Sequence, residues 1–254
     1  MGALIELKNI GYSYHNLAGE TGAIKDVSFQ VEEGEFVALV GPSGCGKSTL
    51  LSIIAGLLAP ETGTIVVNNP DGSLHYPRVG YMLQHDHLFE WRTIYQNVTL
   101  GLEIHHALTK ERTDYVKQLL SDYGLESFQD KRPSELSGGM KQRAALIRTL
   151  ALDPQLLLLD EPFSALDYQT RLTVCDDIAT IIRETKKTAI LITHDLAEAI
   201  STADRVLILS ARPGQVKAEI SLTFAPQYDS PLKRRNAPEF TGYFQNVWRA
   251  LSSR

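Results

Sequence analysis

Residues 36–58, FVALV-GPSGCGKST-LLSIIAGLL, decide the fold. The apolar run 36–40 has the length of a buried strand, the glycine-rich stretch 41–49 predicts a tight loop, and the apolar stretch 50–58 predicts a helix. Gly41–Ser48 fits the pattern G-x-x-x-x-G-K-[ST], in which backbone N–H groups and a helix N-terminus surround phosphate oxygens. Because the strand and the helix that this motif requires are both present, the sequence predicts a nucleoside triphosphate site.

Each residue type in this loop has a physical role. The glycines let backbone N–H groups turn toward the phosphates, Lys47 is expected to neutralise charge on the β- and γ-phosphates, and the Ser48 hydroxyl is expected to coordinate Mg²⁺. Cys45 is expected to serve as a small residue, but its position leads us to expect that thiol alkylation blocks nucleotide binding. The loop residues expected to contact the nucleotide are Gly41, Pro42, Ser43, Gly44, Cys45, Gly46, Lys47, Ser48 and Thr49.

The rest of the chain alternates apolar runs with segments of helical length. Runs of strand length that are apolar throughout predict a parallel sheet covered on both faces. The further strands are expected at 155–160, 188–193 and 205–210, and the helices between them at 141–152, 166–185 and 196–203. The predicted fold class is therefore α/β, and together with the phosphate-binding motif it resembles the parallel sheet core of a RecA-like P-loop NTPase.

Two regions interrupt this alternation. Residues 4–31 and 64–68 look like shorter strands of an antiparallel subdomain, whereas 91–133 is mostly helical, with one helix that starts at Thr109 and ends near Gly124. We predict one ATPase domain over 1–224, with a helical subdomain at about 90–150 inside it. A short C-terminal extension is expected over 225–254, with prolines followed by an amphipathic stretch.

Composition excludes several classes of function. The formal net charge of −5 disfavours a nucleic-acid-binding surface, which needs a surplus of Lys and Arg. No stretch reaches the roughly 20 apolar residues that cross a bilayer, and residues 1–10 do not resemble a signal peptide. The two cysteines show no disulfide spacing, so they are expected to be reduced thiols of a cytosolic protein. A protein of this kind is expected to serve a membrane only as a peripheral subunit.

Two adjacent acids complete the predicted nucleotide site. Asp160 ends the leucine-rich run 155–160, where a carboxylate is placed to hold hydrated Mg²⁺. Glu161 follows directly and is expected to orient or deprotonate the attacking water. Two acids after a strand are also typical of helix capping, but the phosphate loop favours the catalytic interpretation.

Leu136–Arg143, LSGGMKQR, resembles the signature motif of the ABC (ATP-binding cassette) family, and it precedes the Asp160 strand by one helix, as in that family. A Ser-Gly-Gly turn that opens a helix is itself an anion-binding arrangement, although a capped helix after a turn is the simpler interpretation of these eight residues. The resemblance implies that two subunits pack head-to-tail and that each signature closes over the partner's ATP. The signature residues expected at ATP are Ser137, Gly138, Gly139 and Gln142.

Further positions match the same family in order and spacing. Tyr14 looks like the aromatic residue that stacks on adenine, with Tyr12 as a weaker candidate, and Gln84 resembles the glutamine that touches Mg²⁺ and the water. Asp167, in Ser164–Asp167, resembles the loop at the dimer seam, and His194 resembles the histidine that contacts the γ-phosphate. The implied catalytic residues are Glu161, His194, Gln84 and Lys47, and the implied Mg²⁺ ligands are Ser48, Gln84 and Asp160.

The sequence leaves two uses of ATP open. The first is a transport subunit at the cytoplasmic face of the membrane, whose separate permease docks around Leu88–Val98 and which depends indirectly on an extracytoplasmic solute-binding protein. The apolar cluster in that region fits a docking groove and a buried core equally well. The second is a soluble ABC ATPase of the iron–sulfur assembly type. LFEWRT at 88–93, the run 153–167 and SARPG at 210–214 resemble bacterial nitrate, sulfonate and taurine importer ATPases, which favours the first.

Overall fold

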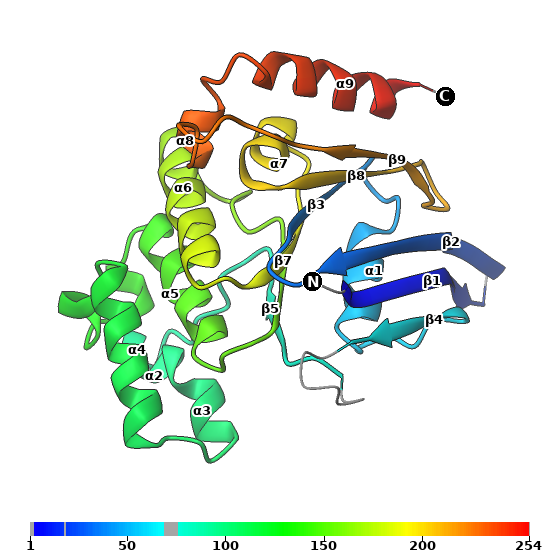
Figure 1. Ribbon diagram of the computed structural model, residues 1–254. Helices are drawn as coiled ribbons and strands as arrows, with labels where there is room; N and C mark the ends of the chain where they lie inside the picture. The colour runs from blue at the N-terminus through cyan, green and yellow to red at the C-terminus, as the bar shows by residue number, and fades with distance from the viewer. Residues whose placement is uncertain (1–2, 18, 69–75, 254) are drawn as a thin grey trace.

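The computed structural model describes residues 3–17, 19–68 and 76–253 (Figure 1). Residues 1–2 of the predicted ATPase domain, residue 18 of the predicted N-terminal strands, residues 69–75 and residue 254 lie outside the described part. Within the described residues, no helix is long and apolar enough to cross a membrane.

A six-stranded sheet forms the centre of the molecule, in the order β5-β6-β7-β3-β8-β9. The first five strands of this order are parallel, and β9 pairs antiparallel with β8. The strands are β3 (Phe36–Val40), β5 (Val79–Met82), β6 (Leu156–Asp160), β7 (Thr188–Ile192), β8 (Arg205–Leu209) and β9 (Val216–Ser221). The parallel core predicted from the sequence is confirmed, whereas β5 and β9 were not predicted as strands.

The apolar strands are buried on both faces. In β3, Phe36, Ala38 and Val40 belong to one hydrophobic cluster, and the alternate residues Val37 and Leu39 belong to a second cluster on the other face. The first cluster is shared with the helical layer and the second with α1 and the antiparallel sheet. A parallel sheet covered on both sides needs side chains of this kind at every position.

The antiparallel sheet has the order β2-β1-β4, formed by β1 (Ala3–Asn16), β2 (Gly19–Glu32) and β4 (Thr62–Val67). β1 and β2 have 14 residues each, so the prediction of shorter strands in this region is wrong. Their pairing shifts register at several points, as between Leu7 and Ile10. Such irregularities break the alternation of apolar and polar residues without ending the strand, which explains the error.

The helices cover the two faces of the central sheet. α1 follows the phosphate loop, α2 to α5 form the helical lobe in green in Figure 1, and α9 packs on α7, β8 and β9. Thr109 caps α4 as predicted, and Ser137 caps α5, so that helix starts before the predicted residue 141. The helices are α1 (Lys47–Ile54), α2 (Ile94–Val98), α3 (Leu100–Ile104), α4 (Lys110–Asp122), α5 (Gly138–Leu150), α6 (Tyr168–Glu184), α7 (Leu196–Thr202), α8 (Pro231–Arg234) and α9 (Phe240–Ser252).

Candidate functional site

A cleft of about 650 Å³ opens beside the phosphate loop. Its walls come from β1 through Tyr14, from the phosphate loop, from the segments after β6 and β7 through Glu161 and His194, and from the loop before β9 through Arg212. We call the loop Gly41–Thr49 together with Asp160, Glu161 and His194 the phosphate-loop half-site. Its members come from far apart in the sequence because the carboxyl ends of parallel strands share one edge of the sheet.

The phosphate loop is held in a conformation that its glycines permit. Gly46 has φ of 103°, and a Cβ there would lie 2.6 Å from the carbonyl oxygen of Ala23. Both the backbone conformation and the lack of space therefore exclude a side chain at this position. The Lys47 Nζ donates to the carbonyl oxygens of Gly41 at 2.8 Å and Pro42 at 3.0 Å. The ammonium group therefore lies across the loop, at the position from which it can reach phosphate oxygens.

Cys45 is turned away from the cleft. Its side chain is buried, and its Sγ lies 3.9 Å from the Lys47 Nζ and would be 2.9 Å from a Cβ added at Gly41. The alkylation expected from its place in the sequence therefore has a steric obstacle, since a reagent can reach the thiol only if the loop opens. The backbone of Cys45 belongs to the loop, and its side chain packs beneath it.

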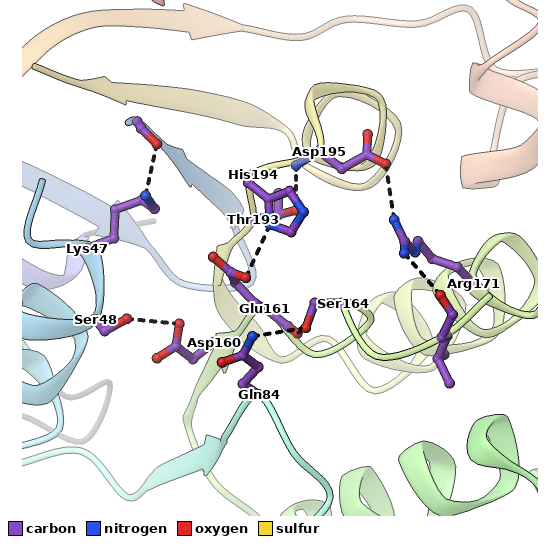
Figure 2. A network of polar contacts seen from close by, with 12 residues as sticks. Lys47, Ser48, Gln84, Asp160, Glu161, Ser164, Arg171, Thr193, His194 and Asp195 are labelled. Carbon is purple, nitrogen blue, oxygen red and sulfur yellow. Dashed lines mark hydrogen bonds and ion pairs between the residues drawn. The ribbon is translucent and has the colours of Figure 1, made fainter. Parts of the chain in front are cut away.

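Two oxygen ligands suited to Mg²⁺ meet at the floor of the half-site. The Ser48 hydroxyl donates to Asp160 Oδ1 at 3.2 Å (Figure 2). The Tyr81 hydroxyl donates to Oδ2 at 3.4 Å. A hydroxyl and a carboxylate fit Mg²⁺, which takes few protein ligands and completes its shell with water and phosphate oxygens. Burial raises the pKa of the Asp160 carboxyl, and the hydrogen bond from Ser48 opposes that shift.

Glu161 and His194 face each other above Asp160. The Glu161 Oε2 lies 3.1 Å from the His194 Nδ1, and His194 is the more exposed of the two (Figure 2). Glu161 has φ of 47°, an uncommon conformation for a residue with a side chain. Strain of this kind is typical of functional sites, where the surrounding structure holds one side chain in a required direction.

Gln84 follows β5 and reaches the same edge of the sheet. Its Nε2 donates to the Ser164 hydroxyl at 3.3 Å, and that hydroxyl donates to the carbonyl oxygen of Glu161 at 3.0 Å (Figure 2). The predicted glutamine is therefore linked through one serine to the backbone of Glu161.

The structure distinguishes the two tyrosines proposed for adenine. Tyr14 lines the cleft, is 42% exposed as a residue, and shares a hydrogen bond of 3.0 Å with the Thr49 hydroxyl. Tyr12 packs against the smaller hydrophobic cluster and meets Tyr14 edge-on, with ring centroids 5.1 Å apart. Only Tyr14 offers a ring face to a ligand in the cleft.

The signature residues lie elsewhere. Ser137 caps α5 through a hydrogen bond from the Met140 N–H, and Asp167 caps α6 through one from the Thr170 N–H. A Cβ at Gly138 would lie 3.0 Å from the Leu166 side chain, so the start of α5 packs beside the loop that leads into α6. We call Ser137–Gln142 together with Asp167 the signature half-site. None of its residues lines the cleft described above.

The region 88–98 combines a buried anchor with exposed aromatics. Asn97 is fully buried and hydrogen-bonds the backbone of Phe89 in both directions, through its Oδ1 at 2.7 Å and its Nδ2 at 3.1 Å. Leu88 is buried, whereas Trp91 is 70% exposed and its ring lies 4.7 Å from that of Phe89. Leu88 is therefore a core residue, whereas Trp91 belongs to the surface. Each of the two interpretations, buried core and exposed docking surface, holds for part of this cluster.

Sequence reasoning missed three side chains at the site. Tyr81 bonds Asp160, and its position on β5 would have indicated this only if β5 had been recognised. Ser164 lay inside the predicted Ser164–Asp167 loop but was given no role. Arg212 lines the cleft from the loop between β8 and β9, 171 residues after Gly41; it lay inside the SARPG stretch at 210–214, which was given no role at the nucleotide.

Comparison with known proteins agrees with this geometry. The family model described as ABC transporter matches residues 24–164. The uncharacterized ABC transporter ATP-binding protein YtlC of Bacillus subtilis is 42% identical over 251 residues, which cover 99% of this chain and 96% of the relative. The nitrate import ATP-binding protein NrtD of Synechocystis sp. is 39% identical, covering 98% and 96%, and the taurine import ATP-binding protein TauB of Yersinia pestis is 41% identical, covering 89% of each chain.

Solved structures show the same fold. The ATP-binding cassette MJ0796, in a dimeric post-hydrolysis state bound to ADP and Pi, matches with a TM-score of 0.71 and 32% identity over 86% of this chain and 99% of that one. The cbiO1 protein of Clostridium perfringens, part of the ABC transporter complex cbiONQ, matches with a TM-score of 0.75 and 27% identity over 87% of this chain and 89% of that one. The chain therefore belongs to the ABC transporter family, as an ATP-binding and ATP-hydrolysing subunit.

Proposed function

We propose that this subunit powers a bacterial importer for a small anionic solute of the nitrate, sulfonate or taurine type. The observation that carries the proposal is the combination of the phosphate-loop half-site with relatives named as nitrate and taurine import subunits. The subunit itself does not touch the cargo, so the class of solute rests on those relatives and on the resemblance at 88–93, 153–167 and 210–214.

The proposed chemistry assigns one task to each group. Lys47 neutralises charge on the β- and γ-phosphates, and Glu161 accepts a hydrogen bond from a water and directs it at the γ-phosphorus. The new P–O bond forms as the bond to the β–γ bridging oxygen breaks, giving ADP and inorganic phosphate. His194, held by Glu161, donates to a γ-phosphate oxygen, and Tyr14 stacks on adenine. Mg²⁺, held by Ser48 and Asp160 with Gln84 close by, supplies charge neutralisation when bound.

The signature half-site acts on the partner's nucleotide in this proposal. Two subunits pack head-to-tail, so that the helix N-terminus at Ser137–Gly139 and the loop at Asp167 close over ATP held by the other subunit. ATP then favours the closed dimer, and loss of the γ-phosphate lets it reopen. Cassettes of this fold have been solved as dimers, which supports the arrangement.

The surface at 88–98 is proposed to receive the permease. Trp91 and Phe89 expose adjacent aromatic rings on a segment fixed by buried Asn97, which suits a docking surface because the anchor holds the rings in place. The subunit would then sit as a peripheral protein on the cytoplasmic face of the membrane, and a solute-binding protein on the other side would deliver the cargo to the permease.

Co-purification tests the transport role. The tagged chain is expressed with its native neighbours, membranes are solubilised gently, and retained proteins are identified by mass spectrometry. A polytopic permease is expected with the wild type and is expected to be lost with Trp91→Glu. Trp248→Glu is the matched control, because Trp248 is a similarly exposed tryptophan, at 60%, on α9.

Both variants are expected to keep the ATPase activity of the isolated subunit. Recovery of only soluble partners would overturn the importer proposal and favour the iron–sulfur assembly class. If a permease is found, calorimetry of the accompanying solute-binding protein with nitrate, taurine and an alkanesulfonate decides the cargo, and binding of none of these solutes would contradict the solute class.

A further inference from the structure

The loop Ser210–Gly214, SARPG, joins β8 to β9 at one end of the nucleotide cleft. It closes on itself: the Ser210 N–H donates to the Gln215 carbonyl oxygen at 2.9 Å, and the Gln215 N–H donates to the Ser210 hydroxyl at 3.0 Å. That hydroxyl also donates to the Pro213 carbonyl oxygen at 3.2 Å. The backbone of this loop is therefore fixed by its own hydrogen bonds, and the chemistry described above makes no use of it.

The same loop is hydrogen-bonded to β2 and packs against the phosphate loop. The Gly214 N–H donates to the Ala23 carbonyl oxygen at 2.9 Å, and the Lys25 N–H donates to the Gly214 carbonyl oxygen at 3.0 Å. A Cβ at Gly214 would lie 2.3 Å from the carbonyl oxygen of Cys45. Glycine is therefore required at this contact, and the loop bridges the antiparallel sheet and the phosphate loop without a gap.

Arg212 projects from this platform into the cleft. Its Nε donates to the Gly22 carbonyl oxygen at 3.0 Å, which fixes the direction of the guanidinium. Among the described residues, no carboxylate forms an ion pair with Arg212, whereas Arg205 of the neighbouring strand pairs with both Glu35 and Glu219. The fixed guanidinium keeps its two terminal amino groups for an acceptor in the cleft.

We propose that Arg212 is a nucleotide-binding residue whose terminal amino groups donate to phosphate oxygens of the nucleotide held in the same subunit's cleft. This rests on ATP binding at the phosphate loop. Phosphate is the acceptor that matches a planar cation with several donors, since adenine and ribose offer no counter-charge. Arg212 thus adds a second positive charge to that of Lys47 in the lining of the cleft, from the loop between β8 and β9.

The test compares affinities for ADP and adenosine by calorimetry, in the wild type, Arg212→Gln, Arg212→Met and Lys47→Ala. We expect each Arg212 variant to weaken ADP binding about tenfold, the loss of one charge-assisted hydrogen bond, and to leave adenosine binding unchanged. Arg249→Gln, which removes the same charge from α9 outside the cleft, is expected to match the wild type. Circular dichroism checks that the variants are folded.

Two results would overturn the proposal. One is unchanged ADP affinity in a folded Arg212 variant, and the other is an equal loss for ADP and adenosine. If Lys47→Ala loses ADP binding while the Arg212 variants do not, the role of Arg212 fails and the nucleotide site stands. If Lys47→Ala also binds ADP normally, the assignment of the cleft fails with it.

A measurement on the wild type does not depend on the folding of any variant. Phenylglyoxal modifies accessible guanidinium groups, and mass spectrometry reports the modified fraction at each arginine. ADP is expected to protect Arg212 several-fold more than adenosine does, with Arg249 modified equally in all samples. Equal modification of Arg212 with and without saturating ADP would contradict the proposed contact.

Discussion

The phosphate-loop half-site and the signature half-site are built on the same local device and differ in what surrounds it. Both begin a helix after a turn that contains glycine, at Lys47 for α1 and at Gly138 for α5. Around the first, Glu161, His194 and Lys47 line one cleft, and Asp160 bonds Ser48, which also lines it. Around the second, Gly138 and Gly139 pack against Leu166, Thr170 and Val174 of the loop before α6 and of α6 itself.

The difference teaches that a helix N-terminus able to bind an anion is not sufficient for hydrolysis. The charged groups that act on the γ-phosphate must be held around it, and within one chain only the phosphate-loop half-site has them among the described residues. In the proposed head-to-tail dimer, the signature half-site acts instead on a nucleotide held by the second subunit. Asp195 and Arg171 connect the two regions, because Arg171 lies 3.9 Å from Asp195 and donates to the Leu166 carbonyl oxygen at 3.0 Å (Figure 2).

The largest effect is expected at Glu161, the proposed catalytic carboxylate. Glu161→Gln should slow phosphate release by at least about 100-fold, because the amide no longer accepts a proton from the water. ATP should still bind, since Lys47 and the phosphate loop are unchanged, and the protein should accumulate as a closed dimer. Phosphate release and light scattering after size exclusion measure both, with exposed Glu184→Gln as the control. A variant that stayed monomeric with ATP, or that kept normal turnover, would contradict this role.

A mixing experiment tests whether the signature half-site works across subunits. Gly138→Asp places a carboxylate at the start of α5 and is expected to lower hydrolysis about 100-fold, as removal of an anion-stabilising donor does, while a single subunit still binds ATP. Lys47→Ala is also expected to be inactive, because it damages the phosphate-loop half-site and leaves the signature half-site intact. An equal mixture of the two should recover about a quarter of wild-type activity, because half of the dimers carry one intact composite site.

The absence of any recovery, with mixed dimers shown to form by mass spectrometry of differently tagged chains, would mean that each chain uses its own signature. The control mixture of Lys47→Ala with Glu161→Gln should stay inactive, since both substitutions damage the same half-site and every composite site in the mixed dimer is lost.

Substitution of the two tyrosines proposed for adenine should affect ATP affinity differently. Tyr14→Ala is expected to weaken ATP binding about 5- to 150-fold, because base–aromatic stacking is worth about 1–3 kcal/mol. Tyr12→Ala should lower thermal stability, because its ring packs on the smaller hydrophobic cluster, and should change ATP affinity less. Calorimetry with ATP and adenosine, together with thermal unfolding, distinguishes them. Equal losses of affinity in both variants would contradict the assignment of Tyr14.

The smallest effect is expected on the pH dependence of stability, from α7, the helix that begins after Asp195. Glu198 on α7 is buried, and burial raises its pKa to about 8, with the nearby Asp195 charge adding to the shift and Arg171 and Arg235 opposing it. Between pH 4.5 and 8 the folded protein keeps this proton and the unfolded chain releases it. The free energy of unfolding should therefore fall as pH rises, by at most about 1.4 kcal/mol per pH unit from this group.

Glu198→Gln is expected to remove that contribution, so its melting temperature should fall less than that of the wild type between pH 5 and pH 8. Scanning calorimetry across this range is the measurement. Glu239→Gln, an exposed acid before α9, should leave the wild-type pH profile in place. Parallel profiles for the wild type and Glu198→Gln would show that Glu198 is ionised throughout.

The sequence by itself determined the parts that depend on neighbours in the chain. Gly41–Ser48 between an apolar run and a helix defined the phosphate loop, the fully apolar runs that became β3, β6, β7 and β8 defined a parallel sheet, and Thr109 marked a helix start. These follow from local rules, because a turn needs its glycines and a strand buried on both faces needs apolar residues at every position.

Only the tertiary structure decided the contacts between distant segments. In the folded chain the Cys45 thiol is buried, and Tyr14 rather than Tyr12 lines the cleft. The fold also brings Arg212 next to Gly22, across 190 residues of chain. These results depend on how the antiparallel sheet, the β8–β9 loop and the phosphate loop pack on one another. That packing is set by burial and by backbone hydrogen bonds between segments, which no local pattern in the sequence records.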